Sequence, residues 1–444
     1  MRPLARRTAL LAGAAALLAG CGEDTWLGEN KGPPLPGKRK PVLLIEDQLT
    51  ADPRLSELKV VLPPPVRNPD WPQVGGSATR AMQHLDAADT IELAWRTSIG
   101  TGTGGRSLLL EPPIVAGGKV FAVDAAGEVS AHDAATGERG WRFLPEDIDE
   151  VDRLQGGAVA YEDGKVFLAS AEGTVLALDA GDGKEIWRQA LGTPIRSAPS
   201  VARGHVLVPS VDSQLFALDA ATGEVRWRHS GLFEQAGHLG GASPAISGDI
   251  VVAAYPSGEV VALSLASGQV LWGDSVLRPR RTLAIGALSG IVGDPVIDGD
   301  RVLVAGASGE MAAFDLERGD RLWATEVTST QTPWVAGDFI YALTERNELV
   351  CLLRQGGRVR WVSPLGELAK PEDKGSTHVR WSGPLLVRDR LLAASSLSEV
   401  ASISPYTGEL LGKAPLAGPV SLPPVVAGGV VYFLTDGGEL LAYR

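Results

Sequence analysis

Residues 217–227 read Ala217-Leu-Asp-Ala-Ala-Thr-Gly-Glu-Val-Arg-Trp227, and residues 177–187 read Ala177-Leu-Asp-Ala-Gly-Asp-Gly-Lys-Glu-Ile-Trp187. Both stretches place a small residue, an aspartate, a glycine and a tryptophan at the same spacing. Self-similarity at a fixed spacing is the signature of a repeat architecture. The recurrence of this spacing along the rest of the chain therefore decides the fold.

Eight copies of the spacing follow one another through the C-terminal part of the chain. In each complete copy the small residue, the glycine and the last position lie 18, 24 and 28 residues after the start. The copies start at Pro113, Val159, Pro199, Pro244, Pro295, Pro333, Pro384 and Pro424. The last position is Trp in six copies and Gly412 in the seventh, and the eighth copy stops at Arg444 before reaching it. Each copy is therefore treated as one structural unit.

The residues inside a copy predict short strands. Residues 119–123 and 128–132 alternate apolar and polar side chains, as half-buried strands do. Gly127 lies between them, and the equivalent position in the other copies holds Gly, Ser or Asn, which all suit turns. Residues 133–137 read as a hairpin loop closed by glycine in the left-handed region. Each copy is thus predicted to form four antiparallel strands, which is one propeller blade.

The two ends of the chain are predicted to meet. The eighth copy lacks an outer strand, and residues 91–96, which precede the first copy, have the pattern of that strand, including Trp95. Closing the ring in this way protects exposed sheet edges. We therefore predict an all-β fold, an eight-bladed β-propeller of four-stranded blades whose ring is closed by an N-terminal strand. The repeated tryptophans are interpreted as packing groups between blades, because each can remove about 150–250 Å² from water.

The first twenty residues have the features of a secretion signal. A basic start precedes an Ala/Leu-rich run over residues 9–20, which is short for a membrane span. The run ends in Leu18-Ala19-Gly20-Cys21, which resembles a bacterial lipobox. By that resemblance, residues 1–20 are a lipoprotein signal peptide, Cys21 is acylated after cleavage, and Gly22 favours the outer over the inner membrane. The alternative is an ordinary secretory cleavage that leaves Cys21 unmodified.

A tether is predicted between the anchor and the propeller. Residues 21–70 contain proline- and glycine-rich runs such as residues 32–37 and 63–65, which resist regular structure and act as spacers. The propeller is predicted to occupy residues 71–444. The tether is expected to let the folded part stand clear of the bilayer.

Composition excludes several classes of protein. The net charge of −12 argues against nucleic acid as the main partner. No apolar run reaches the ~18 residues of a spanning helix, so the lipid anchor is the expected membrane contact. The only cysteines, Cys21 and Cys351, exclude a disulfide scaffold and a cysteine-rich zinc module. Cys351 occupies a position that is mostly Ala in the other copies, so it is interpreted as a small buried hydrophobe.

The repeat motif connects the chain to a known family. The pattern of residues 177–187 resembles the pyrroloquinoline-quinone-type propeller repeat, which quinone-dependent dehydrogenases share with the BamB family of outer-membrane assembly lipoproteins. Residues 68–76 and 330–335 are similar to segments of one BamB branch, and the resemblance covers about residues 66–444. It implies a non-enzymatic scaffold on the periplasmic side of the outer membrane. By the same resemblance its partners are a BamA-like subunit of the β-barrel assembly machine and nascent outer-membrane proteins.

A quinone-dependent dehydrogenase, or another ligand-binding propeller, is the alternative. Many such enzymes carry a vicinal disulfide and a calcium site, but this chain has no Cys-Cys pair and only three asparagines. Residues 100–105 match a dinucleotide fingerprint literally, yet a blade follows them instead of a helix, so they read as a loop. The six histidines are scattered, which predicts no metal site. No cofactor and no catalytic, cofactor-binding or metal-ligating residue is therefore predicted.

Partner binding is predicted on the loops that connect successive blades, because variable loops on a rigid scaffold usually carry binding sites. The 273–294 loop combines basic and large apolar residues, which favour the centres of interfaces. The predicted contact residues are Arg280, Arg281, Leu283 and Ile285 in this loop, with Leu239 in the neighbouring 228–243 loop. The alternative is that these apolar residues cap the blades. BamB relatives place Arg and Asp on the corresponding loops, and this chain departs from that pattern at Leu239, Gly290 and Val292.

Overall fold

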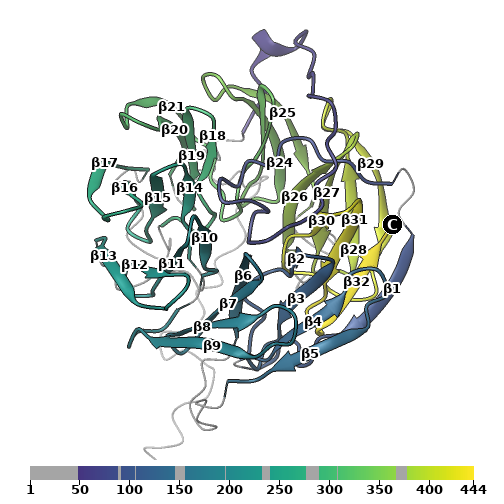
Figure 1. Cartoon of the computed structure of the whole chain (residues 1–444). Helices are drawn as coiled ribbons and strands as arrows, with labels where there is room; N and C mark the ends of the chain where they lie inside the picture. The colour runs from purple at the N-terminus through teal and green to yellow at the C-terminus, as the bar shows by residue number, and fades with distance from the viewer. Residues whose placement is uncertain are drawn as a thin grey trace, which may run out of the picture. The chain divides into compact units, whose positions relative to one another are not determined.

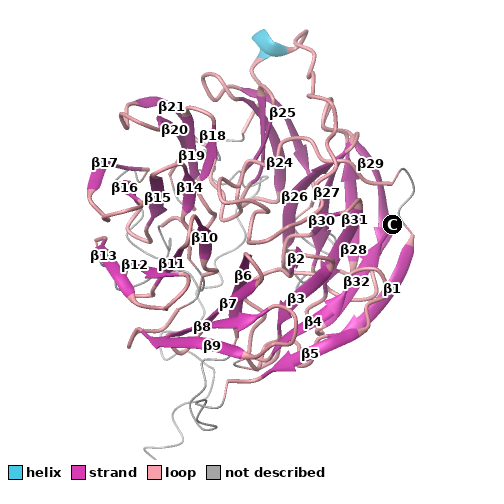
Figure 2. Cartoon of the chain, in the orientation of Figure 1, coloured by secondary structure: helices cyan, strands magenta, loops and turns pink. Residues whose placement is uncertain are grey.

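Eight four-stranded antiparallel sheets follow one another around a ring (Figures 1 and 2). The structure is a computed structural model that describes residues 49–88, 92–105, 107–145, 156–195, 197–232, 241–276, 290–307, 309–366 and 378–444. Residues 49–444 form one compact unit. The all-β, eight-bladed propeller predicted from the repeats is confirmed, and the helix in the described ranges is the single turn η1 (Pro53–Leu55).

The strands of the first seven blades run in chain order across each sheet, starting from the innermost strand. Blades one to four are β2 (Ile114–Ala116), β3 (Lys119–Val123), β4 (Val129–Asp133) and β5 (Arg139–Phe143); β6 (Gly157–Glu162), β7 (Lys165–Ser170), β8 (Thr174–Asp179) and β9 (Glu185–Ala190); β10 (Ser200–Ala202), β11 (His205–Pro209), β12 (Gln214–Asp219) and β13 (Val225–Ser230); and β14 (Ala245–Ser247), β15 (Ile250–Ala254), β16 (Glu259–Ser264) and β17 (Val270–Ser275). Blades five to seven are β18 (Val296–Asp298), β19 (Arg301–Ala305), β20 (Met311–Asp315) and β21 (Arg321–Thr325); β22 (Trp334–Ala336), β23 (Phe339–Leu343), β24 (Glu348–Leu353) and β25 (Val359–Pro364); and β26 (Trp381–Val387), β27 (Arg390–Ser395), β28 (Glu399–Ile403) and β29 (Leu410–Pro415).

The eighth blade joins the two ends of the repeat region, as the sequence predicted. Its inner strands are β30 (Val425–Ala427), β31 (Val430–Leu434) and β32 (Glu439–Tyr443), and β1 (Leu93–Ser98) is its outer strand. Trp95 pairs with Ala442 across the β1–β32 ladder. The main chains of Glu92 and Arg444 exchange two hydrogen bonds of 3.0 Å just beyond this ladder. The closed ring leaves every blade with a neighbour on both sides.

The repeated tryptophans and glycines meet between neighbouring blades. Each Trp ring lies against the turn glycine of the next blade, so closely that a Cβ on the glycine would come within 2.7 Å of the ring. The pairs are Trp95–Gly137, Trp141–Gly183, Trp187–Gly223, Trp227–Gly268, Trp272–Gly319, Trp323–Gly357 and Trp361–Gly408. Each of the seven indole N–H groups also donates to a main-chain carbonyl of that next blade, at 2.8–3.2 Å. The prediction that these tryptophans pack between blades is confirmed.

The same geometry explains why the seventh blade lacks its tryptophan. Gly412 in β29 faces blade eight. In that blade the third strand, β32, and the outer strand, β1, come from opposite ends of the repeat region, so they are paired by hydrogen bonds but no turn connects them. That blade therefore offers no turn glycine for a tryptophan to cover. A Cβ on Gly412 would meet no atom within 4 Å, and Leu410 and Leu411 beside it are 52% and 57% exposed.

The turns between the second and third strands have the left-handed backbone that the sequence predicted. Gly127 has a φ of 87°, and the non-glycine residues Ser213, Asn347 and Ser398 have φ values of 61°, 56° and 62°. Glycine and asparagine adopt this region at low cost, which is why turn-forming residues recur at this position.

The folded part begins earlier than predicted. Residues 49–70 were assigned to the tether, but they belong to the compact unit. The main-chain N–H of Asp52 donates to Val359 in β25 at 2.8 Å, and the Asp52 carboxylate accepts from Arg358 at 2.9 Å. Leu55 is buried. This part of the segment finds partners on the edge of blade six, so the tether prediction is wrong for residues 49–70.

Candidate functional site

Residues 66–87, here called the channel segment, pass once around the inside of the ring. Figure 1 shows this purple-blue part of the chain among the innermost strands. Innermost strands are sheet edges, so one row of their N–H and C=O groups lacks a partner within the blade. The channel segment supplies partners for these groups.

Every blade is contacted, in order, as the channel segment advances. The hydrogen bonds that join it to blades eight, one, two, three, four, five, six and seven are, in that order, Gly428 N–H to Asn68, Val115 N–H to Trp71, Tyr161 N–H to Pro72, Val201 N–H to the Gln73 side chain, Ile246 N–H to Ala78, Ile297 N–H to Thr79, Gly337 N–H to the Gln83 side chain, and Arg388 N–H to Leu85. Their lengths run from 2.7 to 3.1 Å. The channel segment therefore ties all eight blades to one another at the axis.

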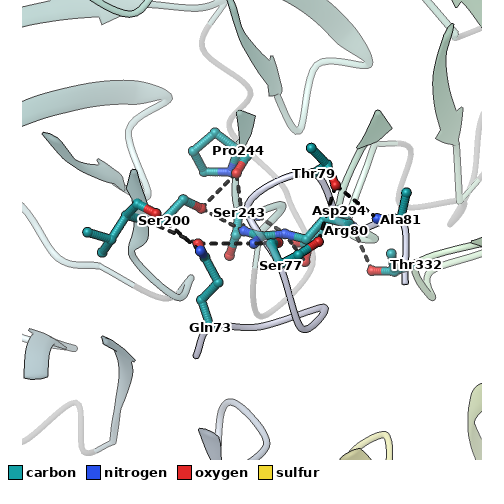
Figure 3. A network of polar contacts seen from close by, with 11 residues as sticks. Gln73, Ser77, Thr79, Arg80, Ala81, Ser200, Ser243, Pro244, Asp294 and Thr332 are labelled. Atoms are coloured by element: carbon teal, nitrogen blue, oxygen red, sulfur yellow. Dashed lines mark hydrogen bonds and ion pairs between the residues drawn. The ribbon is translucent and has the colours of Figure 1, made fainter. Parts of the chain in front are cut away.

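Arg80 anchors the middle of the channel segment (Figure 3). Its side chain is fully buried, and its guanidinium nitrogens reach five acceptors on the segment itself and on blades three to five. Four of them accept hydrogen bonds: Gln73 Oε1 at 3.2 Å, the Ser77 carbonyl at 2.8 Å, Ser200 Oγ at 2.6 Å and the Pro244 carbonyl at 3.1 Å. The fifth, Asp294 Oδ2, forms an ion pair with Arg80 Nε at 3.5 Å. A buried guanidinium is stable only when it is paired and hydrogen-bonded in this way.

Two carboxyl groups lie near this guanidinium. Asp294 accepts the main-chain N–H of Ser243 at 2.7 Å, and burial raises its pKa against the lowering effect of Arg80. Burial, followed by the nearby Asp294, raises the pKa of Glu111 to about 8, although Arg80 and the main-chain amide of Ala198 act in the opposite direction. Perturbed carboxyl groups of this kind mark candidate functional sites.

A cavity of about 200 Å³ lies beside this network. The channel segment contributes Trp71 and Arg80 to its lining, the inter-blade connections contribute Glu111 and Asp294, and β22 contributes Trp334. The two indole rings stack with their centroids 6.3 Å apart. The cavity thus combines aromatic walls with charged groups. Among the described residues, no cluster of three or more His, Cys, Asp or Glu side chains is arranged to hold a metal ion.

Replacing Glu111 with Gln is expected to flatten the dependence of stability on pH. The carboxyl has an ordinary pKa of 4.5 and a pKa of about 8 in the folded protein, so between these values the folded state binds more protons than the unfolded state. Stability therefore falls as pH rises through this window, by up to roughly 4 kcal/mol for this group.

Thermal unfolding of the wild type, Glu111→Gln and the exposed control Glu224→Gln between pH 5.5 and 9 checks this. The wild type and the control should lose stability toward pH 9, and Glu111→Gln should lose clearly less. Equal losses in all three proteins would show that Glu111 titrates normally.

The residues predicted to bind a partner lie outside the described part of the chain. This applies to Leu239, Arg280, Arg281, Leu283 and Ile285, and also to Cys21. The structure describes the flanks of the 273–294 loop. Val276 and Ile291 are buried in the core between blades four and five. For Ile291, the alternative interpretation, that apolar loop residues cap the blades, is therefore the correct one.

Two further interpretations from the sequence can be compared with the structure. The glycine-rich residues 100–105 belong to the connection between β1 and β2, where Thr101 donates to Asp124 and Thr103 donates to the Asp436 carbonyl. They form a loop, as predicted. Cys351 is fully buried, and burial raises the pKa of its thiol, so it is the small buried hydrophobe that its position in the repeat indicated.

The channel network was missed by the sequence analysis. Residues 68–76 were noticed only through a resemblance, and Arg80 and Glu111 were not singled out. Arg80 lies outside the repeats, so its place in the chain gave no signal that it is buried, and its partners lie up to 214 residues away along the chain.

Comparisons with known proteins agree on one family. The family model described as outer membrane protein assembly factor BamB matches residues 74–151 and 125–363. Proteins of that name from Alkalilimnicola ehrlichii and Xanthomonas campestris are 34% and 29% identical to this chain. The first match covers 83% of this chain and 93% of the relative, and the second covers 80% and 86%. A relative of the same name from Legionella pneumophila is 26% identical over only 45% of this chain and 49% of its own length.

Solved structures show the same fold. BamB from Moraxella catarrhalis superposes with a TM-score of 0.66 at 18% identity, covering 80% of this chain and all of that one. A quinohemoprotein alcohol dehydrogenase from Pseudomonas putida superposes with a TM-score of 0.65 at 15% identity, covering 87% and 83%. A BamB protein and an alcohol dehydrogenase therefore share this architecture, and the fold alone does not decide between their functions.

Proposed function

The chain belongs to the family of the outer membrane protein assembly factor BamB, and from that membership we propose that it is a non-enzymatic scaffold of the β-barrel assembly machine. In this role it binds a BamA-like subunit and aids the insertion of nascent outer-membrane proteins. The observation that carries the proposal is the family match, which extends over residues 74–363.

The filled axis of the ring supports a scaffold role. The channel segment bonds to every blade, at its innermost strand or at the turn that follows that strand, and it places the buried Arg80 among blades three to five. A ring tied together at its centre holds the loops between blades in fixed relative positions at their bases. Binding residues on loops over a rigid scaffold are the usual arrangement for recognition.

An enzymatic role remains the second candidate, because quinone-dependent dehydrogenases share the fold. The cavity beside Arg80 would be its site. Native protein purified from its own membranes and found to contain stoichiometric quinone by absorbance, with calcium by elemental analysis, would support the enzyme and contradict the scaffold.

Attachment to the outer membrane is proposed to depend on Cys21. No helix in the described ranges is long and apolar enough to cross a bilayer. Cys21→Ala is expected to move the protein from the outer-membrane fraction to the soluble periplasmic fraction, because several acyl chains are needed for stable anchoring. The unfolding midpoint should not change, since Cys21 lies outside the compact unit of residues 49–444. Membrane fractionation checks this, and complete retention of the variant would contradict an essential lipid anchor.

The 273–294 loop is proposed to bind the partner subunit. Arg280→Glu combined with Ile285→Asp is expected to lower capture of the BamA-like subunit about tenfold or more, because a reversed charge and a polar group would replace interface residues. Capture of that subunit from solubilised outer membranes, detected with a specific antibody, measures the effect.

A matched control variant carries the same kind of changes elsewhere. Arg139→Glu with Ile186→Asp alters an exposed arginine on β5 and an exposed isoleucine on β9, on the outer strands of blades one and two. This control should capture the subunit normally. If the loop variant captures as much as the control, the loop is not the binding site.

A further inference from the structure

The two ends of the channel segment meet beside blade seven. The main-chain N–H of Val66 donates to the carbonyl of His84 at 2.9 Å, and the N–H of Asp86 donates back to the carbonyl of Val66 at 3.0 Å. The N–H of Arg388, in the turn that follows β26, donates to the carbonyl of Leu85 at 2.8 Å. The channel segment is therefore a closed loop whose ends are joined to each other and to one blade.

The His84 side chain makes a second connection at this meeting point. Its ring is buried, with an exposed fraction of 4%. Nδ1 lies 2.6 Å from the carbonyl oxygen of Pro63, just before the channel segment, and Nε2 lies 2.7 Å from the carbonyl oxygen of Arg388. One imidazole ring thus links the entry of the loop, its exit and blade seven. These residues, Pro63, Val66, His84–Asp86 and Arg388, are here called the clasp.

Both partners of the His84 ring are hydrogen-bond acceptors. A carbonyl oxygen cannot donate, and a neutral imidazole has one N–H and one nitrogen without a proton. In a neutral His84, one ring nitrogen would therefore face a carbonyl oxygen at 2.6 or 2.7 Å with no proton between them. Leaving a buried acceptor without a donor is unfavourable. In the imidazolium form both nitrogens donate, so both contacts become hydrogen bonds.

Two other histidines in the described part of the chain show the contrast. Nε2 of His132 lies 3.1 Å from the hydroxyl oxygen of Ser130, and burial lowers the pKa of His132. Nδ1 of His229 lies 2.8 Å from the hydroxyl oxygen of Tyr255. A hydroxyl group can donate as well as accept, so a neutral ring satisfies each of these contacts. His84 has no such partner on either nitrogen.

The charged groups around the clasp do not supply a surplus of negative charge. The charged side chains of residues 63–67, 84–87 and 388–390 are those of Arg67, Asp86, Arg388, Asp389 and Arg390. Asp86 pairs with the Arg388 guanidinium at 3.7 Å, and Asp389 accepts the Tyr406 hydroxyl at 2.6 Å. The two carbonyl oxygens are therefore the groups that stabilise a proton on the His84 ring.

We propose that His84 is a proton-dependent clasp, which as an imidazolium joins both ends of the channel segment to blade seven and weakens when it loses its proton. The proposal goes beyond the scaffold role and does not depend on it. The clasp lies against the blade whose junction with blade eight has no Trp–Gly contact among the described residues. Closure of the axis would thus respond to pH at the junction that has the fewest other contacts of this kind.

The direction of the pH dependence follows from proton binding. An unfolded histidine loses its proton at about pH 6.5. The folded state keeps the His84 proton to a higher pH, because both carbonyl contacts need it. The contribution of the clasp to stability is therefore complete below about pH 6.5 and is lost as the pH rises until the folded state also releases the proton.

Nitrogen-15 NMR of the full mature chain, without an affinity tag and labelled at histidine, tests the protonation state. A ring nitrogen without a proton resonates far downfield of one that carries a proton. At pH 7.5 both nitrogens of His84 should be protonated, whereas His132 should show one nitrogen without a proton. Loss of signals in His84→Gln assigns them. If no histidine of the wild type keeps two protonated nitrogens at pH 7.5, the proposal is overturned, whether or not the variant folds.

Amide hydrogen exchange tests whether loss of the proton weakens the clasp. The measurement uses the chain with Glu111→Gln, so that titration of Glu111 does not contribute. Protection of the Val66, Asp86 and Arg388 N–H groups, corrected for intrinsic exchange, should fall between pH 6.5 and 9. The fall should be about tenfold larger than for Tyr161 N–H, which donates to Pro72 in blade two's contact with the same segment.

Two histidine variants complete the exchange experiment. His84→Gln cannot carry the proton, so its clasp amides should be less protected at pH 6.5 and should change with pH no more than Tyr161 N–H does. The control His378→Gln removes an exposed histidine and should keep the pH-dependent difference. Equal losses of protection at the clasp and at Tyr161 in the chain that retains His84 overturn the proposal.

Discussion

Arg80→Met is expected to destabilise the protein by about 3–5 kcal/mol, because breaking a buried ion pair leaves an uncompensated buried charge. The substitution keeps most of the side-chain volume but removes the guanidinium that Asp294 and four neutral acceptors share. Denaturant unfolding, followed by tryptophan fluorescence, measures the loss.

Two further variants make this prediction specific. Arg54→Met removes an arginine that also pairs with an aspartate, but the Arg54 side chain is 78% exposed, so the loss should be far smaller than that of Arg80→Met. Arg80→Met combined with Asp294→Asn removes both charges of the buried pair and should be more stable than Arg80→Met alone. If Arg80→Met is as stable as Arg54→Met, the channel network does not hold the ring together.

Gly223→Ala is expected to destabilise the protein far more than Gly204→Ala, although both glycines lie in blade three and have similar left-handed φ values of 78° and 72°. A Cβ at Gly223 would lie 2.5 Å from the Trp187 ring, whereas a Cβ at Gly204 meets no atom within 4 Å. Both variants bear the backbone cost of about 1–2 kcal/mol. Gly223→Ala must also displace Trp187, which adds about 1–3 kcal/mol.

The comparison of unfolding free energies therefore isolates the contact between blades from the backbone effect. Trp187→Leu provides the check, because it removes the ring that the new methyl group would strike. In that background Gly223→Ala should cost no more than Gly204→Ala. If the two glycine variants are equally stable in the wild-type background, the close packing of Trp on Gly does not limit blade association.

These two predictions concern different ways of holding one ring together. The Trp–Gly contacts join neighbouring blades near their outer strands, and seven of the eight blade junctions have one. The channel segment joins all eight blades at the axis. The junction between blades seven and eight has no Trp–Gly contact, so we expect it to depend most on the channel segment and on β1.

The sequence by itself determined the fold of the repeat region. The offset from each start to its glycine and tryptophan predicted eight blades, and the incomplete last copy predicted that Trp95 closes the ring. These predictions succeeded because the signal is local and repeated. A hairpin needs a turn residue at a fixed position, and a blade needs a packing group at a fixed position, whatever lies elsewhere in the chain.

Only the tertiary structure decided the path of residues 49–87 and the nature of the channel site. This part of the chain forms no regular strands and shows no periodicity, and many of its partners are main-chain groups that every residue type carries. Asn68 bonds to Val426, which is 358 residues away, and Arg80 bonds to Ser200, which is 120 residues away. No local pattern can encode such pairs. Even Gly412, visible in the sequence as an exception, was explained only when the ring showed that blade eight has no turn glycine to receive a tryptophan.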